Sequence, residues 1–407
     1  MSLAPYTGLV ATNCKNCSSG DAVNNFWMGR SLHTATDNIA SLQLVYANWI
    51  LTHSPSVEDL GGGTTATYTA SIEYPVGVFT QVKFGGSTSG TAASGAKLTS
   101  DATAVVIPQG AQFFVRTYRV HAAGSFLAPV NGFGTTFGQA AGDACTFGTT
   151  NAVTDQTMGG TVVHTGGASG FDMLTPTAII GTTNRPTYFV IGDSRVDGGG
   201  TLISGQQTAT NPCVGEIGPS FYNANVGFII SAIGMDMLSN WSSGLYTLSP
   251  GLAMYCSDVV SNHSINDFTT GSSAATLIAN HQTLRASSAF AGKRYWTCTV
   301  APDTASTDDW RTLANQTIFA QDPARVAYNT AVRAGLPGMY GYFDIAAKVE
   351  SSLNSGKWKV NGDGHYMTAD GVHESTRATA LITSTPFGLP LAVGNLGANG
   401  GLLGIGT

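Results

Sequence analysis

Three polar residues in the second half of the chain have the types and spacing that nucleophilic catalysis needs. Ser194 closely follows the apolar run 188–191, and Asp370 and His373 form an Asp-x-x-His unit near the C-terminus. A serine is activated by an imidazole within hydrogen-bonding reach, and a carboxylate orients that imidazole. The three-residue spacing lets the Asp370 carboxylate turn back onto His373 within one loop. We therefore predict Ser194 as nucleophile, His373 as general base and Asp370 as the group that orients the base.

The stretch around Ser194 has two interpretations when it is taken alone. The apolar run 188–191 leads into Gly192 and Asp193, and Gly198 follows four residues after the serine. A short apolar run bounded by turn residues is typical of a strand buried on both faces of a parallel sheet, and chemistry gathers at the carboxyl ends of such strands. Glycine, aspartate and serine are also common in ordinary turns. The downstream residues favour the nucleophile.

Two further residues could hold the negative charge that forms when a carbonyl group is attacked. Gly234 follows the apolar run 226–233, and a glycine there lets its backbone N–H approach an oxyanion with no Cβ in the way. Asn266 lies in the stretch 264–267, after a third apolar run, and could direct its side-chain amide into the site. We predict that both supply hydrogen-bond donors to an oxyanion hole.

Other polar residues near these blocks are expected to have different roles. We expect Asp193 to brace the serine turn by hydrogen bonds, and Arg195 and Asp197 to hold the loop or contact substrate. His263 could line the pocket, but we favour a structural or surface role for it. His365 belongs to an Asp-x-His unit whose acid lies one residue too close, so we interpret it as a loop histidine.

The six cysteines do not define a redox compartment. Cys14 and Cys17 form a lone Cys-x-x-Cys, with no second pair at a zinc-binding spacing. We expect a local disulfide or two inert thiols there. The sequence implies no metal ion and no organic cofactor.

The first 180 residues have the pattern of β structure. In 68–74, apolar residues alternate with polar ones, which is typical of a half-buried strand. Short runs of this kind, separated by Gly, Ser, Thr and Pro connectors, favour an all-β sandwich or jelly roll. We predict a β-sandwich domain over 1–180, including the Gly/Thr-rich segment 124–170. Its candidate strands are 42–51, 68–74, 79–84, 104–107, 113–120 and 161–164.

From about residue 183 the pattern changes to strands that alternate with helices. This order is typical of βαβ units and a mainly parallel sheet, and we assign 181–407 to an α/β domain that ends in a Gly-rich tail from Gly388. The predicted strands are 188–191, 226–233, 254–260, 294–300 and 341–345. The predicted helices are 274–290, 322–336 and 374–382.

Composition and charge exclude several classes of protein. Charged residues make up 10% of the 407 residues and the formal net charge is −6, with no Lys/Arg cluster of the kind that binds nucleic acid. No apolar run reaches the roughly 18 residues that span a bilayer. The N-terminus shows no signal-peptide pattern. The hydroxyl- and glycine-rich composition favours a secreted or virion-associated protein. The oligomeric state is left open.

The ordered blocks resemble those of the SGNH (GDSL-type) hydrolases over roughly residues 183–385. The match consists of Gly-Asp-Ser with a glycine four residues past the serine, a glycine after the second strand, an x-x-Asn-Asp after the third, and a C-terminal Asp-x-x-His. The resemblance implies a three-layer α/β/α, flavodoxin-like domain. The Gly-x-Ser-x-Gly elbow of ordinary α/β-hydrolases is absent around Ser194.

Carried over residue by residue, the resemblance implies the same roles for Ser194, His373 and Asp370. It also implies that the Ser194 N–H, the Gly234 N–H and the Asn266 amide form the oxyanion hole. The third block departs from the family, which has Gly-x-Asn-Asp where this chain has Ser264 in place of the glycine.

The resemblance implies two-step ester hydrolysis, and the family's substrates include acetylated carbohydrates, lipid or aryl esters, and thioesters. The segment 197–220 is polar and Gly-rich, without a long apolar lid. We therefore expect cleavage of small acyl groups, such as acetyl, on a polysaccharide. Two alternatives stay open. One is a lipid or aryl esterase, or a thioesterase, of the same fold. The other is a glycan-binding or attachment protein with a degenerate hydrolase domain.

Overall fold

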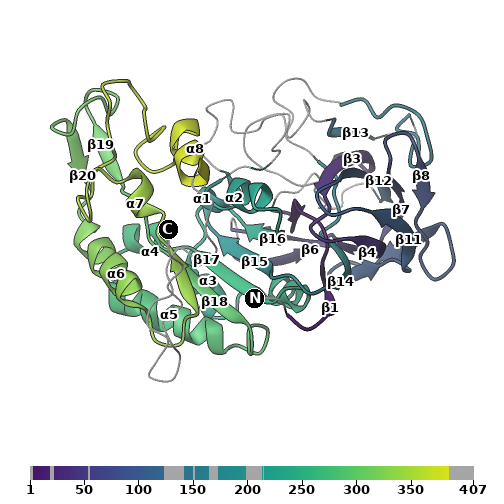
Figure 1. Ribbon diagram of the computed structural model, residues 1–407, viewed down its shortest axis with the longest axis horizontal. Coiled ribbons are helices and arrows are strands. Elements are labelled where there is room, and N and C mark those ends of the chain that lie inside the picture. Colours follow the sequence, from purple (N-terminus) through teal and green to yellow (C-terminus); the bar gives the residue numbers. More distant parts are fainter. Residues whose placement is uncertain are drawn as a thin grey trace.

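The described residues form two antiparallel sheets, one parallel sheet and two short hairpin-like pairs of strands (Figure 1). The structure is a computed structural model. It describes residues 3–18, 23–53, 56–122, 142–149, 152–164, 173–198, 213 and 215–384. The two antiparallel sheets lie at one end of the molecule and the parallel sheet with its helices at the other.

The parallel sheet has six strands in the order β2-β16-β15-β17-β18-β21, and every neighbouring pair runs parallel. After the edge strand β2, this is the order 2-1-3-4-5 of doubly wound flavodoxin-like sheets. The expected α/β fold with a parallel sheet is confirmed. The strands are β2 (Cys14–Lys15), β15 (Thr187–Gly192), β16 (Gly227–Ala232), β17 (Asp258–Asn262), β18 (Arg294–Cys298) and β21 (Gly341–Phe343).

Helices cover both faces of this sheet because its strands are apolar on both sides. In β15, Phe189 and Ile191 pack into the hydrophobic cluster that includes α5 and α6, whereas Tyr188 and Val190 pack into the cluster that includes α2 and α8. The helical segments are α1 (Ser194–Asp197), α2 (Gly218–Asn223), α3 (Leu238–Ser242), the 3-10 helix η2 (Ser249–Tyr255), α4 (Ile265–Thr269), α5 (Ala274–Ala286), α6 (Asp322–Ala334), α7 (Ala346–Val349) and α8 (Thr376–Ser384).

The two antiparallel sheets are built from the first half of the chain. One has the order β1-β14-β4-β10, with β11 also on β4, and the other has the order β13-β3-β12-β7-β8, with β9 also on β7. Their strands are β1 (Tyr6–Leu9), β3 (Phe26–Thr34), β4 (Ile39–Ala47), β7 (Ala66–Glu73), β8 (Phe79–Gln81), β9 (Ser89–Ala92), β10 (Lys97–Thr99), β11 (Thr103–Ile107), β12 (Gln112–His121), β13 (Ala144–Gly148) and β14 (Ala178–Thr183). The short pairs are β5 (Trp49–Thr52) with β6 (Glu58–Gly61), and β19 (Thr304–Ser306) with β20 (Gln316–Ile318).

Aromatic residues pack the two antiparallel sheets together. The Tyr46 ring from β4 stacks on Tyr68 from β7 with centroids 4.6 Å apart, and the Tyr46 hydroxyl lies 2.7 Å from Thr117 Oγ1 in β12. The same hydrophobic cluster continues through β14 to Phe189 and Ile191 of the parallel sheet. The β half and the α/β half therefore share one core.

Some predicted elements differ from the structure. Residues 161–164 are not a strand. The predicted strand 254–260 is divided between the end of η2 and β17, because Pro250 starts a 3-10 turn there. Ten observed strands have no counterpart in the prediction: β1, β2, β3, β6, β9, β10, β13, β14, β19 and β20. Most of 124–170, and the tail from Gly388, lie outside the described residues.

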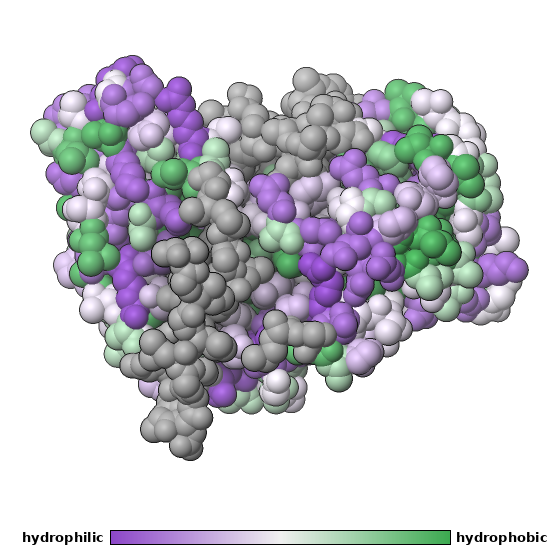
Figure 2. All heavy atoms as spheres, viewed as in Figure 1, coloured by the Kyte–Doolittle hydropathy of each residue, from purple (hydrophilic) through white to green (hydrophobic). Residues whose placement is uncertain are grey.

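The surface mixes hydrophilic and hydrophobic residues, as a chain with few charges requires, and Figure 2 shows both kinds interspersed on one face. Among the described helices, none combines the length and the apolar character needed to cross a bilayer.

Candidate active site

The turn after β15 presents Ser194 at the carboxyl end of a central strand. Asp193 is the N-cap of the short helix α1, and its side chain accepts a hydrogen bond from Arg195 N at 3.0 Å. Gly198 ends the helix in a left-handed conformation with φ 90°. Ser194 is half-buried, while its neighbours Asp193 and Arg195 are buried. The local sequence thus exposes one hydroxyl group above a buried sheet.

The loop before α8 brings an imidazole to this hydroxyl. His373 Nε2 lies 2.8 Å from Ser194 Oγ, and His373 Nδ1 lies 2.7 Å from Asp370 Oδ2. Ser194 Oγ and its partners thus form a relay of two short hydrogen bonds. The side chains of His373 and Asp370 are 19% and 47% exposed, so water and substrate can reach them. The structure brings together the three side chains that the sequence placed in one site.

The backbone of this loop depends on Gly371. Its φ of 94° is one that side chains with a Cβ rarely adopt, and a Cβ at this position would overlap Thr304 O. The Gly371 carbonyl accepts hydrogen bonds from Thr304 N at 3.1 Å and from Trp358 Nε1 at 2.9 Å. The loop that carries His373 is therefore fixed against β19 and the buried Trp358.

Hydrogen bonds keep the Asp370 carboxyl ionised. Partial burial by itself would raise the pKa of Asp370, but hydrogen bonds from the His373 side chain and backbone and from Val372 N outweigh burial and lower the pKa to about 2. A carboxylate beside Nδ1 holds the proton on that nitrogen and leaves Nε2 to accept the serine proton.

The residues predicted for the oxyanion hole follow the two neighbouring strands. Gly192 is paired with Ala232 of β16 on one side and with Asn262 of β17 on the other, so the three strands end at the same level. Ile233 N continues the ladder with a 3.3 Å bond to Gly192 O. Gly234, two residues beyond β16, therefore lies near Ser194, two residues beyond β15.

The Asn266 side chain is positioned by the same loop. Its Nδ2 donates to Asp236 O at 2.9 Å, which uses one of the two amide hydrogens and leaves the second for another acceptor. Ser264, the residue that departs from the family motif, has φ 127° and precedes α4. This is a conformation that favours glycine, so the serine keeps the backbone that the motif's glycine would adopt.

Sequence reasoning missed the acid that anchors this loop. The fully buried Asp236 carboxylate accepts bonds from Asn240, from Trp241 Nε1 at 2.7 Å and from the Tyr246 hydroxyl at 3.1 Å. His263 lies on the other side of the same carboxylate, with Nε2 at 3.4 Å, and is fully buried. Of the two roles favoured for His263, its burial fits the structural one and not the surface one. In the sequence, Asp236 is a single acid after an apolar run, and nothing in that pattern predicts these contacts.

Arg195 and Asp197 hold the serine turn. The buried Arg195 guanidinium donates to Ala301 O at 3.3 Å and to Pro302 O at 3.0 Å. Asp197 Oδ1 lies 2.6 Å from Lys15 Nζ, a residue that sequence reasoning did not select. The His365 ring lies 5.4 Å from that of Trp310, and its Nε2 lies 4.0 Å from Asp309 Oδ1.

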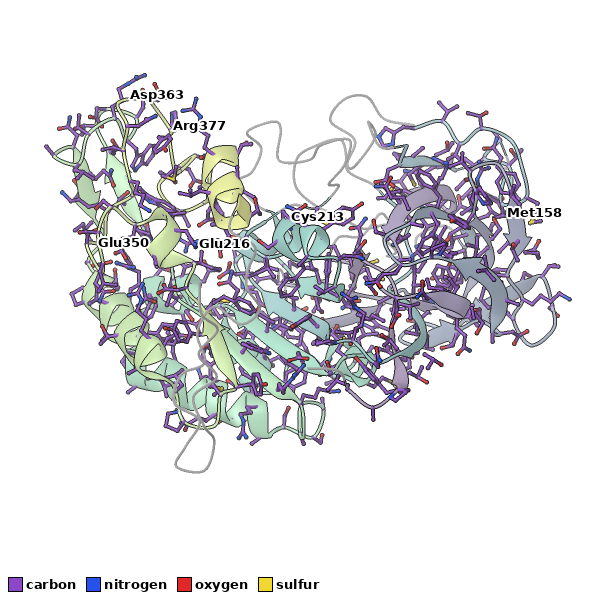
Figure 3. All side chains as sticks on the ribbon, viewed as in Figure 1. Met158, Cys213, Glu216, Glu350, Asp363 and Arg377 are labelled. Atoms are coloured by element: carbon purple, nitrogen blue, oxygen red, sulfur yellow. The ribbon has the colours of Figure 1, made fainter. Side chains whose placement is uncertain are left out.

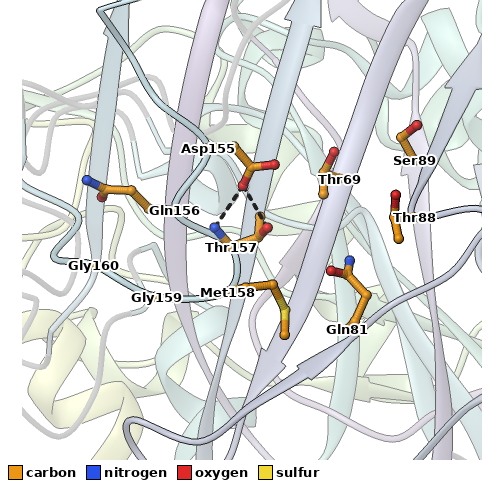
Figure 4. Close-up of a pocket in the computed structure, with 10 residues that line it drawn as sticks. All are labelled: Thr69, Gln81, Thr88, Ser89, Asp155, Gln156, Thr157, Met158, Gly159 and Gly160. Carbon is orange, nitrogen blue, oxygen red and sulfur yellow. Dashed lines mark hydrogen bonds between the residues drawn. The ribbon is translucent and has the colours of Figure 1, made fainter.

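A separate pocket of about 700 Å³ lies on the β half of the molecule (Figure 4). Its walls are strands β7, β8 and β9 and the loop 155–160, and hydroxyl and amide groups dominate them. Arg116 fixes the loop by donating to three of its carbonyls, on Gln156, Gly159 and Gly160, at 2.8–3.1 Å. Figure 3 places Met158 of this pocket at the opposite end of the molecule from Arg377, four residues beyond His373.

Comparisons with known proteins give similar solved structures only. No protein-family model and no curated protein matches the sequence. A lipolytic protein of the G-D-S-L family from Desulfitobacterium hafniense is 10% identical, with 49% of this chain and 97% of that chain covered and a TM-score of 0.35. A family two carbohydrate esterase from Clostridium thermocellum, solved with cellohexaose, is 14% identical, with 94% and 96% covered and a TM-score of 0.34.

A carbohydrate acetylesterase family member from Sinorhizobium meliloti is 12% identical, with 49% of this chain and 94% of that chain covered and a TM-score of 0.33. These three solved structures are thus a G-D-S-L lipolytic protein and two carbohydrate esterases. At these identities and TM-scores, activity and substrate must be inferred from the chain's own residues.

Proposed function

We propose that the protein is a serine esterase of the SGNH type, which hydrolyses small acyl esters through an acyl-enzyme. The observation that supports this most strongly is the relay from Asp370 through His373 to Ser194, with bonds of 2.7 Å and 2.8 Å. A partly exposed serine at the carboxyl end of a central parallel strand, in contact with an oriented imidazole, has the geometry of an activated nucleophile.

The proposed reaction has two steps. Ser194 Oγ attacks the ester carbonyl carbon while His373 Nε2 takes the hydroxyl proton, and Asp370 stabilises the imidazolium. The tetrahedral intermediate collapses as His373 returns this proton to the leaving alcohol. Water then attacks the acyl-enzyme with His373 as base, which releases the carboxylic acid and regenerates Ser194. The Ser194 and Gly234 N–H groups and the Asn266 amide would hold the oxyanion in both steps.

For the substrate we propose acetyl groups on a polysaccharide. Support comes from the sequence of 197–220, which contains no long apolar run of the kind that would form a lid for a fatty acyl chain. The hydroxyl-rich composition also suits a secreted or virion-associated protein that meets such polymers. Lipid or aryl ester and thioester cleavage by the same site is the alternative within this class.

The test compares the wild type with Ser194→Ala. The wild type should release p-nitrophenol from p-nitrophenyl acetate and acetate from an acetylated glycan, and it should leave long-chain esters intact. Ser194→Ala should lose both activities and keep its thermal unfolding midpoint. Full activity in the folded variant would refute the nucleophile. A preference for long-chain esters would keep the nucleophile and overturn the substrate.

A second candidate function is glycan binding by the β half. We propose a jelly-roll-like domain over 1–180 and a hydrolase domain over 181–407. Strand β2 of the first segment joins the parallel sheet of the hydrolase domain. The 700 Å³ pocket of Figure 4 supports binding of an uncharged polyol, because the described side chains that line it are mainly hydroxyls and amides, with the Asp155 carboxylate and no cation. Residues Thr69, Gln81 and Ser89 line one wall.

Binding can be measured apart from catalysis in the full chain carrying Ser194→Ala. Calorimetry with xylohexaose and cellohexaose should detect binding. Thr69→Trp should abolish this binding, because the larger side chain fills the pocket. Binding that survives Thr69→Trp would instead place the glycan at the hydrolase site. A wild type that binds glycans but has no esterase activity would favour an attachment protein with a degenerate hydrolase domain.

A further inference from the structure

Two buried acids that the proposed reaction does not use lie directly behind the relay. Glu374 follows His373 in the sequence and is 2% exposed, and Glu216 lies two residues before α2 and is 1% exposed. Their carboxyl groups are close enough to interact directly, and a hydrogen bond between them requires that one of them carries a proton. The helices that follow them, α2 and α8, also pack together. Figure 3 shows Glu216 next to α8.

Two oxygen atoms of the pair lack a hydrogen-bond donor in the described structure, and ionised carboxylates have no hydrogen to donate to each other. Glu216 Oε2 accepts a hydrogen bond from Asn262 Nδ2, but Glu216 Oε1 and Glu374 Oε1 are both buried with no donor among the residues that the structure describes. Two ionised carboxylates in contact would repel each other in a site that water does not screen. One proton held between them removes the repulsion and supplies the missing donor.

The surrounding charges leave room for one negative charge on the pair. In the described part of the chain, Arg195 from α1 is the cation that faces it, and its charge also interacts with Asp193 and Asp303. The Cys298 thiol at the end of β18 faces Glu216 from the sheet side. One guanidinium cannot neutralise four carboxylates. Burial, and then the neighbouring Glu216, raise the pKa of Glu374 well above its usual range, against the opposing effect of Arg195.

The pair connects the two segments that must meet for catalysis. Glu216 N donates to Arg195 O at 2.9 Å, one residue beyond Ser194, and its carboxyl group is held by Asn262 at the end of β17. Glu374 forms a backbone bridge with Thr368, on the far side of the loop that carries His373. A hydrogen bond between the two carboxyl groups therefore joins the serine turn to the histidine loop.

We propose that Glu216 and Glu374 share one proton and that this bridge positions His373 on Ser194. Both acids act through His373 and Ser194 and contact no substrate. The catalytic part of this inference rests on the proposed esterase function, whereas the shared proton does not.

The first test measures unfolding by urea from pH 5 to pH 9 in the wild type and in Glu374→Gln. The folded wild type holds a proton that the unfolded chain releases above the ordinary glutamate pKa of about 4.3. Its unfolding free energy should therefore fall as pH rises, and the variant should escape that fall. The ratio of the two unfolding equilibrium constants should grow about tenfold per pH unit until the pair itself ionises.

Other titrating groups are common to both proteins and cancel in the ratio. Glu58→Gln, in β6 of the antiparallel half, controls for the loss of one carboxyl group and should follow the wild type. Parallel curves for the wild type and Glu374→Gln would overturn the shared proton. If Glu374→Gln does not fold, infrared spectra of the wild type decide: the C=O band of a protonated carboxylic acid should persist at neutral pH and disappear at alkaline pH.

The second test concerns positioning. Glu374→Gln keeps a donor to Glu216 and should retain kcat/KM within about threefold at pH 7, whereas Glu374→Ala should lose about 100-fold, mostly in kcat, because small displacements of catalytic groups are costly. Wild-type activity should decline at alkaline pH and Glu374→Gln should resist this decline. Equal activity of Glu374→Ala and wild type would overturn the positioning role. If the wild type has no esterase activity but shows the expected unfolding ratio, the proposed esterase function is refuted and the shared proton is still supported.

Discussion

Lys15 and Asp197 form a buried ion pair that joins the N-terminal segment to the helix of the candidate nucleophile. Their Nζ and Oδ1 atoms are 2.6 Å apart, and the side chains are 7% and 1% exposed. Lys15 belongs to β2, which pairs in parallel with β16 at the edge of the parallel sheet. The first residues of the chain are therefore part of the scaffold of the Ser194 turn.

Removing the cation should destabilise the protein because it leaves Asp197 buried without its charge partner. For Lys15→Met we expect a loss of about 3–5 kcal/mol in the free energy of unfolding. Urea denaturation checks this. Lys15→Met with Asp197→Asn should recover part of the loss, since no unpaired charge remains. The exposed Lys97→Met is the control and should stay within about 0.5 kcal/mol. Equal stability of Lys15→Met and Lys97→Met would contradict the account.

Asn266→Ala tests the oxyanion hole. Loss of one donor should lower kcat by about 100- to 1000-fold, with KM much less affected, because the donor acts on charge that develops in the transition state. Steady-state kinetics on p-nitrophenyl acetate measure this. The variant also loses its bond to Asp236 O, so circular dichroism must show that it is folded. A folded variant with an unchanged kcat would remove Asn266 from the hole.

Gly371→Ala tests whether the histidine loop must keep its backbone. An alanine would clash with Thr304 O as well as adopt a disfavoured φ, so His373 should move away from Ser194 and activity should fall at least about 100-fold. Gly362→Ala is a matched control, because Gly362 has φ 95° with no heavy atom within 4 Å of an added Cβ. That control should lose about 1 kcal/mol of stability and little activity. Similar activities in both variants would contradict this role.

Ser264→Gly should stabilise the protein. The serine adopts φ 127°, where a glycine has no steric penalty, so relief of this strain should add about 1 kcal/mol to the free energy of unfolding. The Asn266 loop keeps its backbone, and activity should be unchanged or higher. Thermal and urea unfolding check the stability. A less stable variant would show that the Ser264 side chain makes contacts that outweigh the strain.

The sequence predicted those parts of the fold that depend on local patterns of apolar and polar residues. The alternation of apolar runs and helices after residue 183 appears as the parallel sheet, and the side chains of Ser194, Asp370 and His373 lie within hydrogen-bonding distance in series. Strand ends and short motifs carry this information, because parallel strands end at one edge.

Residues whose roles depend on contacts with residues far away in the sequence could not be predicted from local patterns. Lys15 is 182 positions from Asp197, and β2 has only two residues, too few for any periodicity. Glu216 and Glu374 are ordinary acids in the sequence and meet only because α2 and α8 pack together. The segment 161–164 has the residue types of a strand but pairs with no strand among the described residues, so its β propensity is not realised there.

The central claim is that His373 activates Ser194 as a nucleophile. A fluorophosphonate probe reacts covalently with activated serines, and mass spectrometry of the digested protein locates the label. The account predicts one labelled residue, Ser194, with labelling abolished in Ser194→Ala and strongly reduced in His373→Ala. Labelling of another serine, or labelling of Ser194 at the same rate in His373→Ala, would contradict it.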